Sequence, residues 1–341
     1  MKIGKVSESV LKRSVLKNIR SKNTEIISGA GVGADCAIFA PSGSVKYASC
    51  VQEARLSCDG QAEEYLLSKE ADELSTPAVT IGELIQKAAN NLAAAGAGIT
   101  AIQTVFLLPT DFEEPQLKKL MIQAEEKARE LQIQIAGGQT RITETVSAPQ
   151  AIVTAHGKLW GDTLSGIKPG QDIVVTKWIG LEGTAMLAHR YKEGLLTRYP
   201  EYLVEEAAGF GRYLSVIPEA ATAVKSGVCA MHDASEGGIF AALWEIAEAA
   251  GVGLTIDLKK LPLRQETVEV CEYCDVNPYE LKAGGSMVMT TEDGPGLVAA
   301  LEAARIPACM VGKVTEGKGR ILLNEEEVRY MDRPRTDEIY R

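Results

Sequence analysis

Three short polar loops next to expected strands carry the residues best suited to chemistry. They are Gly33–Cys36, which contains Asp35, Gly137–Thr140, and Met231–Gly238, which contains Asp233. Each combines glycine, which lets backbone N–H groups approach a ligand, with a carboxylate or a hydroxyl. Such loops could hold a phosphate or its magnesium ion, because Mg²⁺ prefers oxygen ligands. Any one of them alone is more often a turn, so the hypothesis depends on all three together.

Two glycine-rich stretches do not fit the nucleotide motifs that they resemble. Gly29–Ala34 matches a dinucleotide fingerprint formally, but a strand pattern follows it where that motif requires a helix. Gly312–Gly319 nearly fits a phosphate-binding loop, but Gly319 stands in place of the magnesium-binding hydroxyl and a strand follows. We interpret both as ordinary loops.

The cysteines and histidines do not predict a metal site. Cys271 and Cys274 form a lone C-x-x-C within an expected helix, whereas structural zinc needs about four ligands. The histidines at 156, 189 and 232 are dispersed along the chain. The seven cysteines are an odd number in a large chain, which is typical of reduced thiols in a cytosolic protein.

The elements that must position the loops alternate between helix and strand in both halves. The first half predicts one helix to about residue 20, another from Thr80 to about Ala95, and a third over 111–131. Its strands are expected at 25–28, 36–40, 45–51, 101–108, 132–136 and 148–159, with a turn at Gly137-Gly138 and a polar loop over 58–76. The second half predicts helices at 181–190, 205–216, 236–250, 267–274 and 296–304, and strands at 172–176, 253–257, 286–290 and 308–314. Gly161–Gly170 is the clearest break, so we expect an α/β fold of two domains, 1–160 and 161–341.

Composition limits the function classes. The chain of 341 residues is 45% hydrophobic and 24% charged, as a globular protein is, and its net charge is −10. A nucleic-acid partner is not expected, because such binding requires a basic face. No apolar run approaches the ~20 residues of a membrane span, and Met1–Glu8 lacks the apolar core of a signal peptide. We therefore expect a cytoplasmic protein without a membrane partner.

Taken in order, the loops resemble the AIR synthase superfamily, and in particular its HypE-like branch. The matching stretches are Gly33–Ala37, Asn90–Ala97, Gly137–Arg141 and Asp233–Gly238. Gly237–Gly253 is also HypE-like, and the resemblance spans about residues 1 to 340. It implies the PurM-like fold: an N-terminal domain of nucleotide-binding type with dimer-forming strands, then a C-terminal α/β domain.

The resemblance also implies ATP and Mg²⁺ in a cleft near the dimer interface. Asp35 would be the metal ligand, while no catalytic residue can be assigned. The implied cofactor-binding residues are Lys5, Asp35, Asn91, Gly137, Gly138, Thr140, Arg141 and Asp233.

Several family acids are replaced in this chain. Ala34, Val51, Asn91 and Gln139 stand at positions of the family's acidic or histidine residues, although Glu53 lies close enough to substitute for Val51. Arg141 replaces a glutamate. It could bind a phosphate directly and so take over part of the charge neutralisation that the metal provides. The tail after Cys309 contains no cysteine, so the family's cyanide-ligand reaction is not expected.

Two functions therefore remain open. The first is an ATP-dependent ligase or transferase with a site of reduced acidity, which phosphorylates an amide-type oxygen of an unknown small molecule. The second is a non-catalytic dimeric scaffold or partner subunit that binds another anionic ligand. A homodimer is expected, with a heterodimer of paralogues as the alternative.

Overall fold

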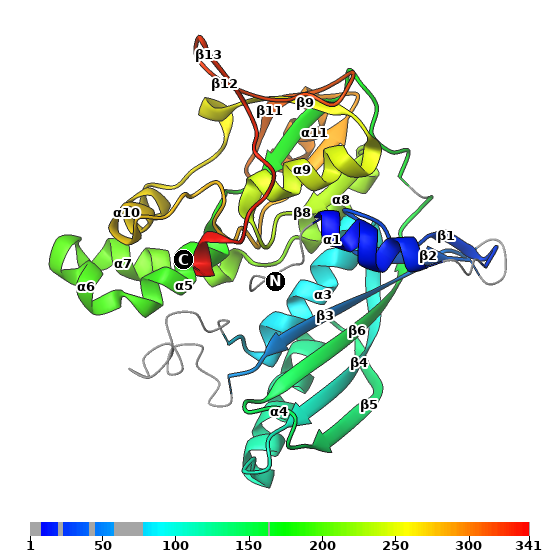
Figure 1. Cartoon of the computed structure of the whole chain (residues 1–341), viewed down its shortest axis with the longest axis vertical. Coiled ribbons are helices and arrows are strands. Elements are labelled where there is room, and N and C mark those ends of the chain that lie inside the picture. Colours follow the sequence, from blue (N-terminus) through cyan, green and yellow to red (C-terminus); the bar gives the residue numbers. More distant parts are fainter. Residues whose placement is uncertain (1–7, 20–22, 41–44, 58–77, 163, 341) are drawn as a thin grey trace.

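The computed structural model describes residues 8–19, 23–40, 45–57, 78–162 and 164–340 (Figure 1). Lys5 and the polar stretch at 58–76 lie outside the described residues. The strands form one sheet of six and one of seven, with helices packed on both, so the expected α/β class is confirmed. None of the described helices is long and apolar enough to cross a membrane.

The first sheet is formed by strands between residues 26 and 159, in the order β1-β2-β3-β6-β4-β5. All neighbours are antiparallel except β4 and β5, which are parallel. The strands are β1 Ile26–Ser28, β2 Cys36–Phe39, β3 Tyr47–Arg55, β4 Ala97–Leu108, β5 Gln134–Ile142 and β6 Gln150–Leu159. One face packs on α3 (Ile81–Ala94) and, beyond it, α4 (Glu114–Glu130), because alternate strand residues such as Ile102 and Phe106 are buried there.

The expected turn at Gly137-Gly138 is wrong, because β5 continues through both glycines to Ile142. The two glycines pair with Gln103 and Thr104 of β4 after a bulge at Ala136. A Cβ on Gly138 would lie 1.9 Å from the carbonyl oxygen of Thr104. The glycine is therefore needed for close contact between two strands.

Helix α3 begins with a capping box, in which Thr80 and Glu83 bond each other's backbone N–H groups. Its C-terminal turn is buried between the two sheets, with Ala93 and Ala94 in the same core as Val216 and Met231. Asn90 fixes it there: its Nδ2 donates to the carbonyl of Leu214 at 2.7 Å and its Oδ1 accepts from the N–H of Val216 at 3.1 Å.

The second sheet is formed by strands between residues 172 and 330, in the order β13-β12-β9-β11-β7-β10-β8. The strands are β7 Asp172–Thr176, β8 Ala230–Asp233, β9 Gly253–Asp257, β10 Met287–Thr291, β11 Ala308–Thr315, β12 Arg320–Asn324 and β13 Glu327–Tyr330. Helix α9 (Gly238–Ala250) packs on one face, while α8 (Ile217–Lys225) and α11 (Gly294–Ala303) pack on the other. Both faces of β7 and β10 are therefore buried.

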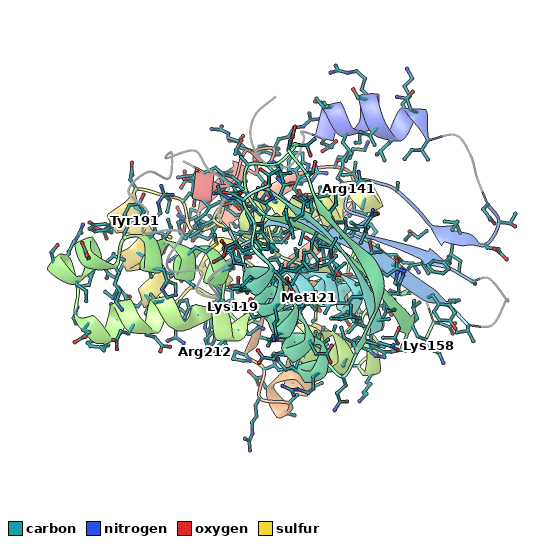
Figure 2. All side chains as sticks on the ribbon, turned by 90° about the horizontal axis from the view of Figure 1, so that it is seen from below. Lys119, Met121, Arg141, Lys158, Tyr191 and Arg212 are labelled. Carbon is teal, nitrogen blue, oxygen red and sulfur yellow. The ribbon has the colours of Figure 1, made fainter. Side chains whose placement is uncertain are left out.

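A helical lobe extends to one side, where Tyr191 and Arg212 are labelled in Figure 2. Its helices share a small core around Leu187, Val204 and Val270. They are α5 Leu181–Arg190, α6 Lys192–Arg198, α7 Glu201–Ala208 and α10 Gln265–Cys274. The helix expected over 205–216 is wrong in its bounds: α7 ends at Ala208 and a 3-10 turn, Gly209–Tyr213, follows because two glycines weaken the α-helix.

At the N-terminus, α1 (Glu8–Val10) continues as two short helical turns, η1 Leu11–Val15 and η2 Leu16–Asn18. Lys12 bonds Glu248 at 2.5 Å and Trp244 Nε1 donates to Glu8 at 3.1 Å. This segment therefore lies against α9, which carries one of the candidate site's loops at its own N-terminus (Figure 1).

Candidate functional site

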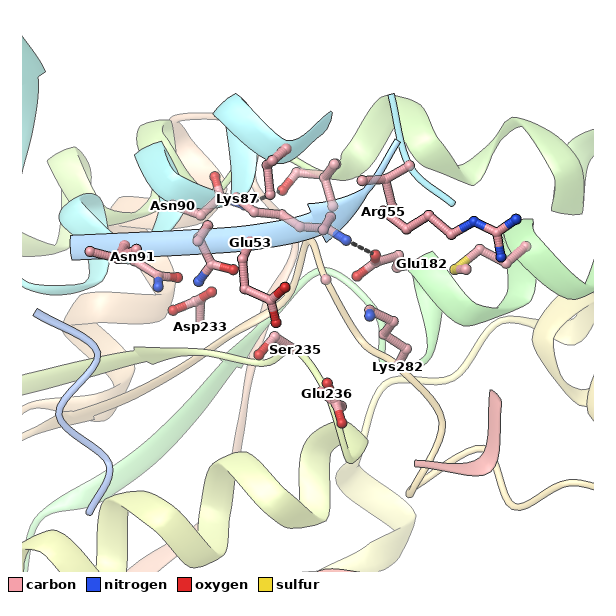
Figure 3. Close-up of a pocket in the computed structure, with 18 of the residues that line it drawn as sticks. Glu53, Arg55, Lys87, Asn90, Asn91, Glu182, Asp233, Ser235, Glu236 and Lys282 are labelled. Atoms are coloured by element: carbon pink, nitrogen blue, oxygen red, sulfur yellow. Dashed lines mark hydrogen bonds and ion pairs between the residues drawn. The ribbon is translucent and has the colours of Figure 1, made fainter. Parts of the chain in front are cut away.

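A cavity of about 750 Å³ lies between β3 and α3 on one side and the C-terminal half on the other (Figure 3). That volume is within the range of small-ligand sites. From the C-terminal half, α5, the β8–α9 loop, the segment before β10 and Tyr340 contribute residues to its wall. Three of the predicted site residues meet in it: Asp35, Asn91 and Asp233.

The acidic end of the cavity contains Asp35, His232 and Asp233, whose potential ligand atoms lie within 4.8 Å of one another. Asp35 comes from the loop before β2, and His232 and Asp233 end β8. Nε2 of His232 lies 3.0 Å from Glu245 of α9, and its Nδ1 lies 3.5 Å from Asp35 Oδ2. Burial opposes the charge of His232, but the hydrogen bond to Glu245 and the charges of Asp35 and Asp233 outweigh it and raise its pKa to about 9.

Asn91 holds this end in place from α3. Its amide is oriented by its partners: Nδ2 donates to Asp233 Oδ2 at 3.1 Å, and Oδ1 accepts from Gln52 at 2.6 Å. Asn91 thus supports a carboxylate and is not positioned as a cation ligand. Glu53, two residues after the exposed Val51 on β3, supplies a further carboxylate to the cavity wall.

The opposite end contains an ion-pair cluster that motifs did not reveal (Figure 3). Lys87 Nζ, on α3, lies 2.5 Å from Glu182 Oε1, on α5. Lys282, from the segment before β10, faces the same carboxylate. Burial opposes the ionisation of Glu182, but Lys87 and Lys282 outweigh it and lower the pKa of its carboxyl. Burial likewise opposes the charge of Lys282, but Glu182, Tyr340 and Asp337 outweigh it and raise its pKa. Both groups are therefore charged at neutral pH.

Two atoms of this cluster remain available to a ligand. No hydrogen bond satisfies the buried Glu182 Oε2 among the described residues. That oxygen lies over Gly284, where a Cβ would be only 2.3 Å away, so glycine makes room for the carboxylate. The ammonium group of Lys282 also makes no hydrogen bond with the described side chains. The cluster thus offers one acceptor and one donor to the cavity.

The N-terminus of α9 is occupied by the chain's own C-terminal segment. Asp337 accepts hydrogen bonds from the N–H groups of Gly237, Lys282 and Ile339. The turn Glu338–Tyr340 places Tyr340 in the cavity wall. A helix N-terminus attracts anions, and here a carboxylate takes that role.

Replacing Asp337 with alanine should release this segment. The loss of three hydrogen bonds, one of them at the N-terminus of α9, should lower the free energy of unfolding by about 1–3 kcal/mol. Hydrogen exchange at the amide of Gly237 would report the release directly, and Asp332→Ala, at an exposed neighbouring position, is the matched control. Unchanged exchange at Gly237 would contradict this role.

The remaining predicted residues lie elsewhere. Gly137, Gly138, Thr140 and Arg141 are on β5 at the edge of the first sheet, exposed, and do not line this cavity. Arg141, labelled in Figure 2, therefore does not fill the site of its own chain.

His232, Lys87, Glu182 and Lys282 were missed as site residues. The histidines appeared dispersed in sequence, but the fold brings His232 to Asp35. Its position immediately before Asp233 was the only available signal. As expected, Cys271 and Cys274 lie together on α10, where burial raises the pKa values of their thiols to about 12 and 11.

The fold and site define an α/β protein with a charged cleft between two sheet-based halves. The AIR synthase-related N-terminal domain matches residues 33–159, and the AIR synthase-related C-terminal domain matches residues 168–323. The chain therefore belongs to the AIR synthase/HypE superfamily, as the sequence motifs indicated.

Similar proteins agree with this assignment. Carbamoyl dehydratase HypE of Rhodobacter capsulatus is 28% identical over 68% of this chain and 69% of its own length. A putative hydrogenase expression/formation protein of Methanocaldococcus jannaschii, MJ0676, is 26% identical over 85% of this chain and 80% of its own. The crystal structure of a hydrogenase maturation protein HypE in complex with ATP has the same PurM-like fold, with a TM-score of 0.68, 17% identity, and coverage of 99% and 97%.

The donor set fits a divalent cation. Asp35 and Asp233 place two carboxylates at one end of the cavity, and Asp35 keeps a third of its side chain exposed. Such sites commonly use one or two carboxylates and complete the coordination with phosphates and water.

Proposed function

We propose that this protein binds ATP with a divalent cation in the cleft and uses it to activate an amide-type oxygen of a small acceptor. The observation that carries the proposal is the separation of charge along the cavity. Carboxylates gather at one end, and a charged donor and an unsatisfied acceptor lie at the other. One end suits a cation with phosphates, and the other suits a neutral polar group.

At the acidic end, Asp35 and Asp233 would hold the cation, and Asn91 would keep Asp233 oriented through its 3.1 Å hydrogen bond. Bound ATP would supply the phosphoryl group, with the cation neutralising its charge. The protein's contribution at this end is placement of two carboxylates, one immediately before β2 and one at the end of β8.

At the other end, Lys282 would donate to the carbonyl oxygen of the acceptor and Glu182 Oε2 would accept its N–H. An amide offers both partners, so a primary amide satisfies both atoms at once. Because the pKa of Glu182 is lowered, its carboxylate is ionised and can take the N–H proton as the oxygen is phosphorylated. The name of the carbamoyl dehydratase relatives also contains an amide-bearing group, the carbamoyl group.

A second copy of this chain would complete the cleft. Glycines 137 and 138, Thr140 and Arg141 lie exposed on β5, and Val51 is exposed on the uncovered face of the same sheet. We propose a homodimer through this face, in which β5 of one protomer brings Arg141 toward the phosphates bound by the other. This arrangement agrees with the expectation of a cleft near a dimer interface.

Calorimetric titration of the metal-stripped protein with ATP, without a divalent cation and with either Mg²⁺ or Zn²⁺, tests the proposal. We expect micromolar binding that depends on the cation and weakens at least about tenfold in Asp35→Asn, since a ligand charge is lost. Glu325→Gln, exposed on the β12–β13 hairpin, is the control and should leave binding unchanged.

Two outcomes would redirect the proposal. Binding that ignores the cation would assign charge neutralisation to Arg141. Absence of binding in both conditions would overturn the ATP-dependent function and favour the scaffold or partner-subunit function, for which the exposed face of the first sheet is the available surface.

A further inference from the structure

His232 lies between two carboxylates from different parts of the chain, and its two ring nitrogens make different contacts. Nε2 lies 3.0 Å from Glu245 Oε2, a normal hydrogen-bond distance. Nδ1 lies 3.5 Å from Asp35 Oδ2, longer than the ~2.7–2.9 Å of a charge-assisted hydrogen bond. The imidazole is therefore bonded closely on one side only.

The longer distance matches that between two ligands of one metal ion. Zinc bonds nitrogen and oxygen at about 2.0–2.1 Å, so two ligands in tetrahedral geometry lie roughly 3.3–3.4 Å apart. The ligand atom of Asp233 lies within 4.8 Å of the other two, and both carboxylates line the cavity. The three atoms thus lie close enough together to bind one ion beside the cavity.

The hydrogen bond to Glu245 is the contact that metal-binding histidines usually make. Such a histidine commonly donates its second ring N–H to a carboxylate, which fixes the ring and directs the other nitrogen at the metal. Helix α9 supplies Glu245 in that position. The carboxylates of Asp35, Asp233 and Glu245 favour a positive charge between them, and a divalent ion would supply that charge.

We propose that Asp35, His232 and Asp233 form a three-ligand site for a divalent transition metal, with Zn²⁺ as its preferred ion and an open coordination position facing the cavity. An imidazole ligand favours Zn²⁺ over Mg²⁺, which is bound mainly by oxygen. The inference deepens the proposed function, because two carboxylates are shared with it, but its test requires no nucleotide.

The alternative is an ion-pair cluster that joins the two halves of the protein without a metal. The ion-pair cluster uses the same contacts as the metal site, so a measurement of metal binding must decide between the two. We would strip the full-length protein of metal and titrate it with Zn²⁺ against a chromophoric chelator, with and without millimolar Mg²⁺. We expect one high-affinity Zn²⁺ per chain, which Mg²⁺ does not displace.

Two variants and one control define the ligands. His232→Gln should weaken Zn²⁺ binding at least about 100-fold, and Glu245→Gln about 10–100-fold, because it loses only the supporting bond. His156→Gln alters a strand histidine that contacts Ser49 and should bind Zn²⁺ like the wild type. Equal affinity in His232→Gln, or displacement by Mg²⁺, would overturn the proposal.

X-ray absorption of the Zn²⁺-loaded wild type avoids any dependence on the folding of variants. A first shell with one imidazole and oxygen ligands at about 2.0–2.1 Å supports the site, whereas sulfur ligands or no imidazole would rule it out. The ATP titration is read separately. Zn²⁺ binding without ATP binding would reject the proposed function and keep this inference. ATP binding without Zn²⁺ binding would reject this inference and keep the proposed function.

Discussion

Replacing Glu182 with glutamine should lower the free energy of unfolding by about 3–5 kcal/mol, because removal of one partner leaves buried charge unpaired. Glu182 is the carboxylate shared by Lys87, at 2.5 Å, and Lys282. Glutamine keeps the size and removes the charge, so two ammonium groups would face each other in the cavity wall. Urea unfolding followed by circular dichroism measures the loss.

A double variant separates this effect from a packing defect. Lys87→Met combined with Glu182→Gln removes one charge of each sign and should recover part of the stability that Glu182→Gln loses. A loss below about 1 kcal/mol in the single variant would show that the cluster is solvated and contributes little.

The same carboxylate predicts a dependence on pH. Since its pKa is lowered from the ordinary 4.5, Glu182 stabilises the fold above that pH, and the contribution is lost as pH falls below it. The difference in stability between wild type and Glu182→Gln should therefore shrink on acidification. A difference that stays constant from pH 7 to below 4.5 would contradict the lowered pKa.

Gly138→Ala should separate β5 from β4. The new methyl group would lie 1.9 Å from the carbonyl oxygen of Thr104, and backbone cannot yield as a flexible side chain does. We expect a loss of about 3 kcal/mol or more, at or above the upper end for overpacking. Faster hydrogen exchange along β4 and β5, together with urea unfolding, measures it.

Gly137→Ala is the matched control. Gly137 has nearly the same φ, 159° against 153°, but nothing lies within 4 Å of its would-be Cβ. Both variants therefore share any backbone cost, and their difference isolates the contact with Thr104. Equal stability of the two variants would show that β5 shifts freely. In the proposed homodimer, only Gly138→Ala should also weaken association.

The sequence predicted the parts of the site that short motifs encode. Asp35, Asn91 and Asp233 stand in glycine-containing or helical motifs, and the fold brings them together. The role of Asn91 could not be predicted, because it depends on which amide atom faces Asp233. Lys87, Glu182 and Lys282 stand in no motif. Their importance comes from burial against one another, although positions 87 and 182 are 95 residues apart and positions 182 and 282 are 100 apart.

The fold was predictable where periodicity was strong and less so near glycine. Helix α5 has the expected bounds because its apolar residues repeat at helical spacing. Gly137-Gly138 was misread because a glycine pair usually indicates a turn. Here Gly138 is needed instead for the close pairing of β4 and β5. Strand β8 was missed because most of its residues were assigned to the polar loop Met231–Gly238.

The burial of α3 has a consequence for how ligands enter. Asn90 bonds the backbone at Leu214 and Val216, and Ala93 and Ala94 share a core with the second sheet. A hinge opening of the two halves would have to break these hydrogen bonds and expose that core. Ligand exchange is therefore expected to proceed through local displacement of the Asp337–Tyr340 segment, and thermal unfolding of both sheets should occur as one cooperative transition.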